Sequence, residues 1–270
     1  MQIYGIDFTS RPGRRKPMTC VSCNLDRKTL TATELHRWED FRDFERFLLQ
    51  PDPYIAGIDF PFGMPRRFIE NIGWPTTWPG YVSLVGNMTR QEFRNALDSY
   101  RERRPPGDKE HRRRTDIASG ALSPQKLSGT PVGLMFYEGA PRLYRAGVTA
   151  PGLLDGDPQR VVVEAYPGLL ARSLIGRLPY KQDVKARQTN AHRAAREELL
   201  ARITTGHLES SHGINVNASR RFLDDPGADD LDALLCAIQA AWAWRHRHRE
   251  YGMPRDTDPL EGWISDPRGM

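Results

Sequence analysis

This sequence has few cysteines, lacks long apolar runs and does not begin like a signal peptide. Its 270 residues include three cysteines, too few for a disulfide framework, so we expect a reducing compartment. The first residues lack the charged start and long apolar core of a signal peptide. The most apolar later run, Leu231–Trp244, contains Asp232 and is too short to span a bilayer. The sequence therefore favours a soluble, cytoplasmic protein without a membrane partner, and it shows no internal repeat.

Size and charge leave many classes of function open. A chain with 39% hydrophobic and 27% charged residues can build a sizeable core, as one large domain or one domain with an insertion. Lys and Arg number 39 against 34 Asp and Glu, which gives a net charge of +5. The basic residues are clustered, and a local cluster attracts polyanions more than the total charge does. A soluble protein with a well-charged surface explains the total equally well.

Three apolar runs in the sequence each have a carboxylate near their end. The acids are Asp7, Asp59 and Glu164, and the residues before them are rich in Ile, Val, Tyr and Ala. Such runs, without polar alternation, are typical of strands covered on both faces, as in parallel sheets. In these sheets ligand chemistry gathers at the carboxyl ends of the strands. Because a buried carboxylate needs a partner or a bound cation, we expect the three acids to share one negative cleft.

The pattern between these runs predicts a meander followed by an insertion. Met18–Leu25 and Thr29–Trp38 are predicted strands that form the meander with the first one, and Glu39–Gln50 is a predicted helix that Pro51 stops. We expect region 62–159 to be an insertion of helices and loops over the cleft. Its expected parts are a helix at Pro65–Ile72, a capping box at Thr89–Glu92, a basic loop at Arg101–Arg114 and a partly helical stretch at Val132–Gly147 kinked by Pro141.

The last third of the sequence predicts two helices. A charged amphipathic helix is expected over Asp183–Thr204, then a loop over His207–Asn217, then a final helix over Ala228–Arg249. The apolar residues of the final helix recur at the i, i+3, i+4, i+7 spacing of a buried face. We therefore expect a single domain over 1–252, with the insertion at about 62–159, and an irregular tail over 253–270.

The final helix begins with the acids Asp229, Asp230 and Asp232. Residues three apart share a face of a helix, so Asp229 and Asp232 point the same way and Asp230 is rotated away. Acids in a first turn also complement the helix dipole, which accounts for Asp229 and Asp230 without any function. The dipole accounts less well for Asp232, because core residues flank it.

Together with the strand acids, this helix predicts a site for divalent cations. Several carboxylates in one cleft repel each other unless cations bind between them. Oxygen ligands of this kind select Mg²⁺ or Mn²⁺ over zinc. Two such ions can clamp the attacking and leaving oxygens of a phosphoryl transfer. The candidate catalytic residues are Asp7, Asp59, Glu164, Asp229 and Asp232.

The predicted order of elements resembles the ribonuclease H-like superfold, an α/β fold whose mixed sheet is flanked by helices. Asp229–Leu234 is similar to the last acidic motif of RuvC-type resolvases, in which two Asp stand three apart before Ala-Leu. More closely, four collinear motifs resemble the domain of unknown function 429 family of predicted nucleases. They are Gly5-Ile6-Asp7, Gly57–Gly63, Glu164–Pro167 and Asp230–Ala233. The family usually has His where Tyr166 stands.

The resemblance implies a metal-dependent nuclease that hydrolyses the phosphodiester bonds of DNA or RNA with two Mg²⁺ or Mn²⁺ ions. It implies that Asp7 bridges the ions and that Asp59 ligates one of them. Asp232, with Asp229 or Asp230, would complete the ligands from the helix.

Further residues are expected to act beside the ions. Glu164 would be a ligand, a base that orients water, or a residue that supports a ligand. The candidate substrate contacts are Thr9, Ser10, Arg14, Arg15, Lys16, Lys181, Lys185 and Arg187. Basic side chains that contact phosphates position a nucleic-acid backbone without reading its sequence, and the loop Arg101–Arg114 is another candidate of this kind. Solvated loops and an ordinary helix surface explain these basic residues equally well.

Two other functions stay open. An actin-like or sugar-kinase-like phosphotransferase uses the same superfold with a similar first Asp, although it normally needs two such halves. A non-catalytic nucleic-acid-binding module could keep the acids as relics. Cys20 and Cys23 have the spacing of metal ligands, but two residues at that spacing in a strand face opposite sides, so we interpret them as packing residues.

Overall fold

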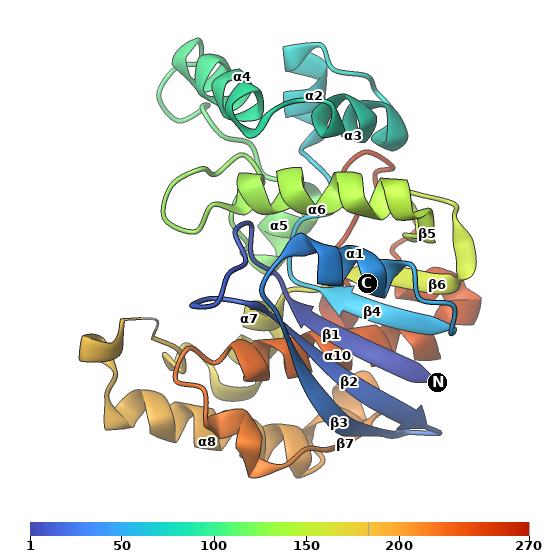
Figure 1. The fold of residues 1–270 in the computed structure, drawn as a ribbon, viewed down its shortest axis with the longest axis vertical. Coiled ribbons are helices and arrows are strands. Elements are labelled where there is room, and N and C mark those ends of the chain that lie inside the picture. The colour runs from blue at the N-terminus through green and yellow to red at the C-terminus, as the bar shows by residue number, and fades with distance from the viewer. Residues whose placement is uncertain (183, 270) are drawn as a thin grey trace.

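The protein is organised around one mixed sheet. Figure 1 shows the computed structural model, which describes residues 1–182 and 184–269. Within these residues the sheet has seven strands in the order β5-β6-β4-β1-β2-β3-β7. The strands are β1 (Gln2–Asp7), β2 (Met18–Asp26), β3 (Thr29–Trp38), β4 (Tyr54–Ile58), β5 (Val148–Thr149), β6 (Asp157–Glu164) and β7 (Asn215–Asn217). Flanked by helices, this sheet makes the chain an α/β protein and is compatible with a ribonuclease H-like fold.

The strand directions confirm the predicted meander and the parallel strands beside it. β1, β2 and β3 are successive antiparallel neighbours. β4 runs parallel to β1, and β6 runs parallel to β4. The registers align Gly5 with Gly57 and Gly57 with Val163. The three acid-bearing strands therefore end at one edge of the sheet, as expected for parallel strands.

Helices cover both faces of the sheet. In Figure 1, α10 lies on the far side, α2, α3 and α4 lie together at the top, and α8 lies at the bottom. The α-helices of the described residues are α1 (Phe41–Leu48), α2 (Arg66–Ile72), α3 (Trp78–Gly86), α4 (Arg90–Glu102), α5 (Arg114–Ser119), α6 (Val132–Ala146), α7 (Pro167–Ile175), α8 (Asn190–Thr204), α9 (His207–His212) and α10 (Asp229–Arg245). Short 3-10 helices occur at Lys185–Arg187, Arg220–Leu223, Arg247–Gly252 and Pro267–Gly269.

The alternation of strand residues divides the core in two. Ile3 and Ile55 pack with α10 on one face, and Ile6 and Ile58 pack with α1, α3 and α6 on the other. Cys20 and Cys23 belong to opposite cores and are free and buried, which confirms their interpretation as packing residues.

Several predicted boundaries in the last third are wrong. The final helix is shorter than predicted and ends at Arg245. α8 begins at Asn190 because the side chain of Thr189 caps it by accepting a hydrogen bond from the His192 amide. The predicted start, Asp183, lies outside the described residues. The predicted loop at 207–217 instead contains α9 and β7, and β7 pairs with Thr29–Thr31 of β3.

The inserted region is more helical than predicted. The helix after Pro65 and the capping box at Thr89 and Glu92 are confirmed. α6 runs as one helix with Pro141 inside it, where a partly helical stretch was expected. The predicted basic loop is also too long, because α4 extends to Glu102 and α5 begins at Arg114.

The C-terminal tail is irregular, as predicted, but it packs into the domain. Trp263 is buried against Trp242 of α10, with ring centroids 6.4 Å apart. The Ser265 amide donates to the Glu164 carbonyl at 2.8 Å, so the tail extends the edge of the sheet beside β6. No helix in the described part of the chain combines the length and the apolar character needed to cross a membrane.

Candidate metal centre

Two glycines bring the last helix directly onto the central strands. A Cβ atom built on Gly5 would lie 1.9 Å from the Ala233 carbonyl oxygen, and one on Gly57 would lie 2.2 Å from the Cys236 carbonyl oxygen. The backbone of α10 therefore occupies the space where side chains of β1 and β4 would stand. Side chains two residues apart on a strand share a face, so Asp7 and Asp59 follow these glycines on the face that α10 covers.

The first turn of α10 supplies the third acid. Asp232 precedes Cys236 by four residues, so it lies one turn along the same helix face, toward the ends of the strands. The helix start is fixed by Asp225, whose carboxylate accepts hydrogen bonds from the amides of Asp229 (2.7 Å) and Gly227 (3.0 Å). The fold thus brings Asp7 and Asp59 close to Asp232, which is more than 170 residues later in the sequence.

These carboxylates lie close enough for their charges to act on one another. Burial raises the pKa of Asp7 well above its usual value, and the charges of Asp232, Asp229 and Asp59 raise it further. Burial also raises the pKa of Asp59, to about 7, with Lys181 opposing the rise and Asp232 adding to it. Mutual repulsion of this kind is relieved by a cation placed between the groups.

A positively charged side chain, that of Lys181, already lies in the cluster. The Lys181 ammonium donates to Asp232 Oδ2 at 2.7 Å, and the buried Tyr180 hydroxyl donates to Oδ1 of the same carboxylate at 2.6 Å. Asp232 is 1% exposed, whereas the Lys181 side chain is half-exposed. The pKa of Lys181 is raised well above its usual value, chiefly by the charge of Asp232.

With this geometry in place, comparison with known proteins assigns the family. Residues 5–257 match the family described as "Protein of unknown function (DUF429)". The chain belongs to the DUF429 family. The match spans all four acidic motifs, so the resemblance seen in the sequence is confirmed at the level of the family. No curated protein and no solved structure matches the chain.

Two of the predicted acids of this DUF429 chain point away from the cluster, although the charge of Glu164 still adds to the raised pKa of Asp59. Asp230 is rotated away from Asp232, as expected, and its buried carboxylate is paired with the guanidinium of Arg37 on β3. Glu164 aligns in register with Ile58, so it points to the face opposite Asp7 and Asp59. Of the alternatives Asp229 and Asp230, it is Asp229 whose charge reaches Asp7.

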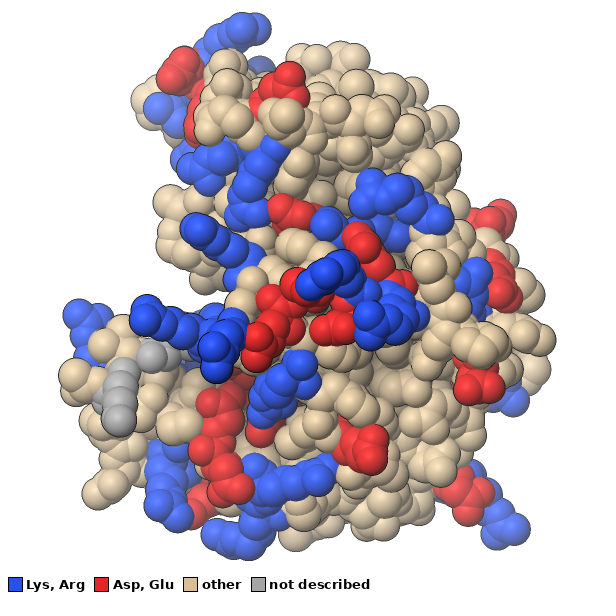
Figure 2. Space-filling model, viewed as in Figure 1, with Lys and Arg blue, Asp and Glu red and all other residues tan. Residues whose placement is uncertain are grey.

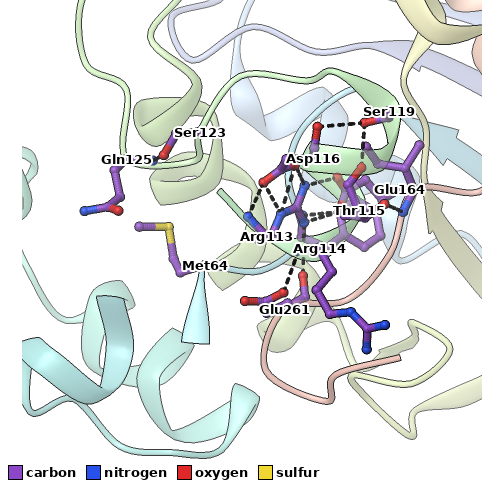
Figure 3. Close-up of polar contacts among 12 residues, drawn as sticks. Met64, Arg113, Arg114, Thr115, Asp116, Ser119, Ser123, Gln125, Glu164 and Glu261 are labelled. Atoms are coloured by element: carbon purple, nitrogen blue, oxygen red, sulfur yellow. Dashed lines mark hydrogen bonds and ion pairs between the residues drawn. The ribbon is translucent and has the colours of Figure 1, made fainter. Parts of the chain in front are cut away.

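Glu164 is held in a buried ionic network (Figure 3). Its carboxylate accepts hydrogen bonds from Arg113 Nη1 (2.7 Å) and Nη2 (2.5 Å) and from the Phe62 amide (2.8 Å). Arg113 is 1% exposed and also pairs with Asp116 at 2.7 Å. The prediction of a solvent-facing phosphate contact is therefore wrong for Arg113. Burial raises the pKa of Glu164, and Arg113 opposes that rise.

The predicted substrate contacts lie around the acids. Figure 2 shows acidic side chains gathered near the middle of one face with Lys and Arg around them. Arg14 and Arg15 are exposed on the turn after β1, and Lys16 Nζ lies 3.6 Å from Asp229 Oδ1. Arg187 is exposed on its 3-10 helix, and the side chain of Lys185 lies outside the described part of the structure.

Thr9 and Ser10, whose hydroxyls were predicted as substrate contacts, also make contacts within the fold. The Thr9 hydroxyl oxygen accepts a hydrogen bond from the Arg11 amide at 3.4 Å. Ser10 is buried, and its carbonyl accepts from Arg90 Nη1 at 2.9 Å. Both residues help to shape the loop that leaves the Asp7 strand.

The donor set fits a hard divalent cation in type and charge. Asp7, Asp59, Asp229 and Asp232 offer carboxylate oxygens, which Mg²⁺ and Mn²⁺ prefer. Among the residues that the structure describes, no group of three or more His, Cys, Asp or Glu side chains is arranged so that it could hold a metal ion. Lys181 and Tyr180 occupy both oxygens of Asp232 instead.

Sequence reasoning missed Tyr180 at this centre and Arg37 beside it, and it misread the buried Arg113, the partner of Glu164. Each acts through a contact with an acid distant in the sequence. The only local signal was the neighbour of Tyr180, since Lys181 was predicted to lie at the site.

Proposed function

We propose that this DUF429 protein is a metal-dependent nuclease that hydrolyses phosphodiester bonds in nucleic acid. The observation that carries the proposal is the convergence of Asp7, Asp59 and Asp232 where α10 meets β1 and β4. These acids and Asp229 would hold Mg²⁺ or Mn²⁺. When bound, such ions supply positive charge to the attacking and leaving oxygens of the reaction.

The chain's own residues would prepare the site in distinct ways. Tyr180 fixes the carboxylate of Asp232 through its 2.6 Å hydrogen bond. Lys181 is half-exposed and can turn from Asp232 to a phosphate oxygen of the substrate. The Glu164 carboxylate accepts a hydrogen bond from the amide of Phe62, which is three residues after Asp59. We therefore assign Glu164 to holding the turn that follows Asp59.

The basic turn after β1 would position the substrate backbone. Arg14 and Arg15 are exposed, and they follow the Asp7 strand directly. Lysine and arginine contacts to phosphates add affinity that falls with salt and carries no sequence preference. This arrangement supports nucleic acid, DNA or RNA, as the partner.

The decisive experiment is a cleavage assay with Mn²⁺ on labelled single-stranded, duplex, branched and RNA substrates. Wild type should cleave at least one of them, and Asp7→Asn should reduce the rate by at least about 100-fold. Asp52→Asn is a matched control, because Asp52 is exposed and precedes β4 at the opposite edge of the sheet. Cleavage that survives Asp7→Asn would refute the assignment.

Calorimetry with Mn²⁺ separates this proposal from the two other functions. A nuclease site takes up the ion in wild type and takes up less in Asp7→Asn. Failure to bind Mn²⁺ would favour a non-catalytic binding module. Hydrolysis of ATP that depends on a sugar acceptor would favour the phosphotransferase.

A further inference from the structure

Beside the acid cluster lies a cavity to which the proposed function assigns no role. Its volume is about 240 Å³, and Asp59 and Lys181 form part of its lining. The cavity lies at the carboxyl edge of the sheet, between the ends of β4 and β6 and the residues around the start of α6. A molecule inside the cavity would therefore lie directly beside the candidate metal centre.

The walls of the cavity are largely apolar. Phe60, Val132, Met135 and Tyr166 line it. Leu122 lines it as well, and this leucine is 47% exposed, so it presents an apolar side chain to solvent beside the opening. Apolar and aromatic walls with a few polar groups are typical of ligand sites.

Three charged groups of the lining are paired with one another. Arg113 is engaged by both Glu164 and Asp116, and all three side chains are buried. These charges sum to one negative charge, so a phosphate inside the cavity would be repelled. A neutral planar group avoids that repulsion, whereas Lys181 at the edge offers an ammonium to an anion outside.

We propose that this cavity receives one unpaired nucleobase of the substrate, with the adjoining phosphate at Lys181 and the acid cluster. The inference rests on the proposed function and names its substrate class. The volume falls below the roughly 300–1,000 Å³ of pockets that bind whole small molecules. The space therefore suits one ring system. Tyr166 lines the space, and we assign its aromatic ring to stacking on the base.

This assignment predicts which nucleic acids the protein takes. A base inside a duplex must leave the stack and lose its pairing before it can enter, which costs a few kcal/mol. A base in a single strand pays much less of that cost. We therefore expect single strands, or locally unpaired nucleotides, to be bound more tightly than a continuous duplex.

The test is a binding scan with abasic sites. Fluorescence anisotropy is measured in EDTA, and again in Ca²⁺, with a labelled single-stranded DNA or RNA in which one abasic nucleotide is moved along the strand. One position should weaken binding by about 5- to 150-fold, the range expected for losing one stacked base, and the others should change it little.

Variants connect the effect to the cavity. Leu122→Asp places a charge at the opening, so the intact strand should bind no better than the abasic one and the abasic site should add no further loss. Tyr166→Ala should act in the same direction, and Tyr166→Phe should restore binding. Leu49→Asp is the matched control, because Leu49 is 61% exposed at the end of α1, before β4 begins.

The outcomes separate this inference from the nuclease proposal. Mn²⁺-dependent cleavage without any position-dependent abasic effect overturns the nucleobase cavity and leaves the nuclease standing. An abasic effect that Leu122→Asp removes, without cleavage, supports the cavity and overturns the nuclease. Loss of binding by Leu122→Asp that is equal for intact and abasic strands also overturns the cavity.

Discussion

The pKa of a single residue, Asp59, sets a pH dependence for metal binding. Its pKa is raised to about 7, first by burial and then by neighbouring acids, so below pH 7 the carboxyl holds a proton that a metal ion must displace. We predict that the affinity for Mn²⁺ rises as the pH increases through 7. Calorimetry at pH 6 and pH 8 measures this, and Asp59→Asn should flatten the rise. A constant affinity across that range would contradict the prediction.

The same raised pKa affects the stability of the metal-free protein. The folded state holds the Asp59 proton up to about pH 7, whereas an unfolded aspartate loses it near its ordinary value of about 4. The folded state thus binds more protons across this window, and stability falls as the pH rises through it. We predict that Asp59→Asn raises the free energy of unfolding at pH 8 by on the order of 2 kcal/mol, measured by urea denaturation in EDTA.

Lys181 competes with the metal ion for Asp232. The ammonium lies 2.7 Å from one carboxylate oxygen, so its charge partly replaces that of a divalent cation. We predict that Lys181→Met binds Mn²⁺ about 10-fold more tightly in calorimetry, because one positive charge leaves the cluster. Lys28→Met is the control, since Lys28 is exposed between β2 and β3, distant from the acids. Weaker Mn²⁺ binding by Lys181→Met would show that the lysine supports the site instead.

At the scale of elements, the contact between α10 and β4 depends on a residue without a side chain. A Cβ on Gly57 would lie 2.2 Å from the Cys236 carbonyl oxygen, which belongs to helical backbone and cannot rotate away. We predict that Gly57→Ala lowers the free energy of unfolding by about 1–3 kcal/mol and also weakens Mn²⁺ binding, because Asp232 moves with the helix. Urea denaturation and calorimetry measure the two effects. Gly13→Ala should change neither, since nothing lies within 4 Å of its Cβ position.

The elements that sequence could predict are those whose pattern is local. Apolar runs ending in Asp7 and Asp59 identify two buried strands, and the capping box at Thr89 marks a helix start. β7 has three residues, too few for a strand pattern to appear in the sequence. It forms because it pairs with β3, which is distant in the chain. Arg113 was misread for the same reason: its basic neighbours suggest solvent, and only the tertiary fold brings Glu164 to it.

At the scale of the whole molecule, Arg113 joins three separate segments of the chain. It pairs with Asp116 in the insertion and Glu164 at the end of β6, and it donates to the Glu261 carbonyl of the tail at 3.0 Å. We predict that Arg113→Met lowers the free energy of unfolding by about 3–5 kcal/mol, because two buried carboxylates lose their cation. Arg112→Met is the control, since Arg112 is exposed. A loss of less than about 1 kcal/mol in urea denaturation would contradict this role.

The acid cluster also draws on both ends of this chain, with Asp7 in the first strand and Asp232 in the last helix. A ribosome adds the helix long after the sheet strands β1 and β4 have emerged. A nascent or prematurely terminated polypeptide that stops before α10 would hold two aspartates without their partner. Under the proposed function, a growing chain on the ribosome therefore lacks the complete cation site until α10 has been synthesised.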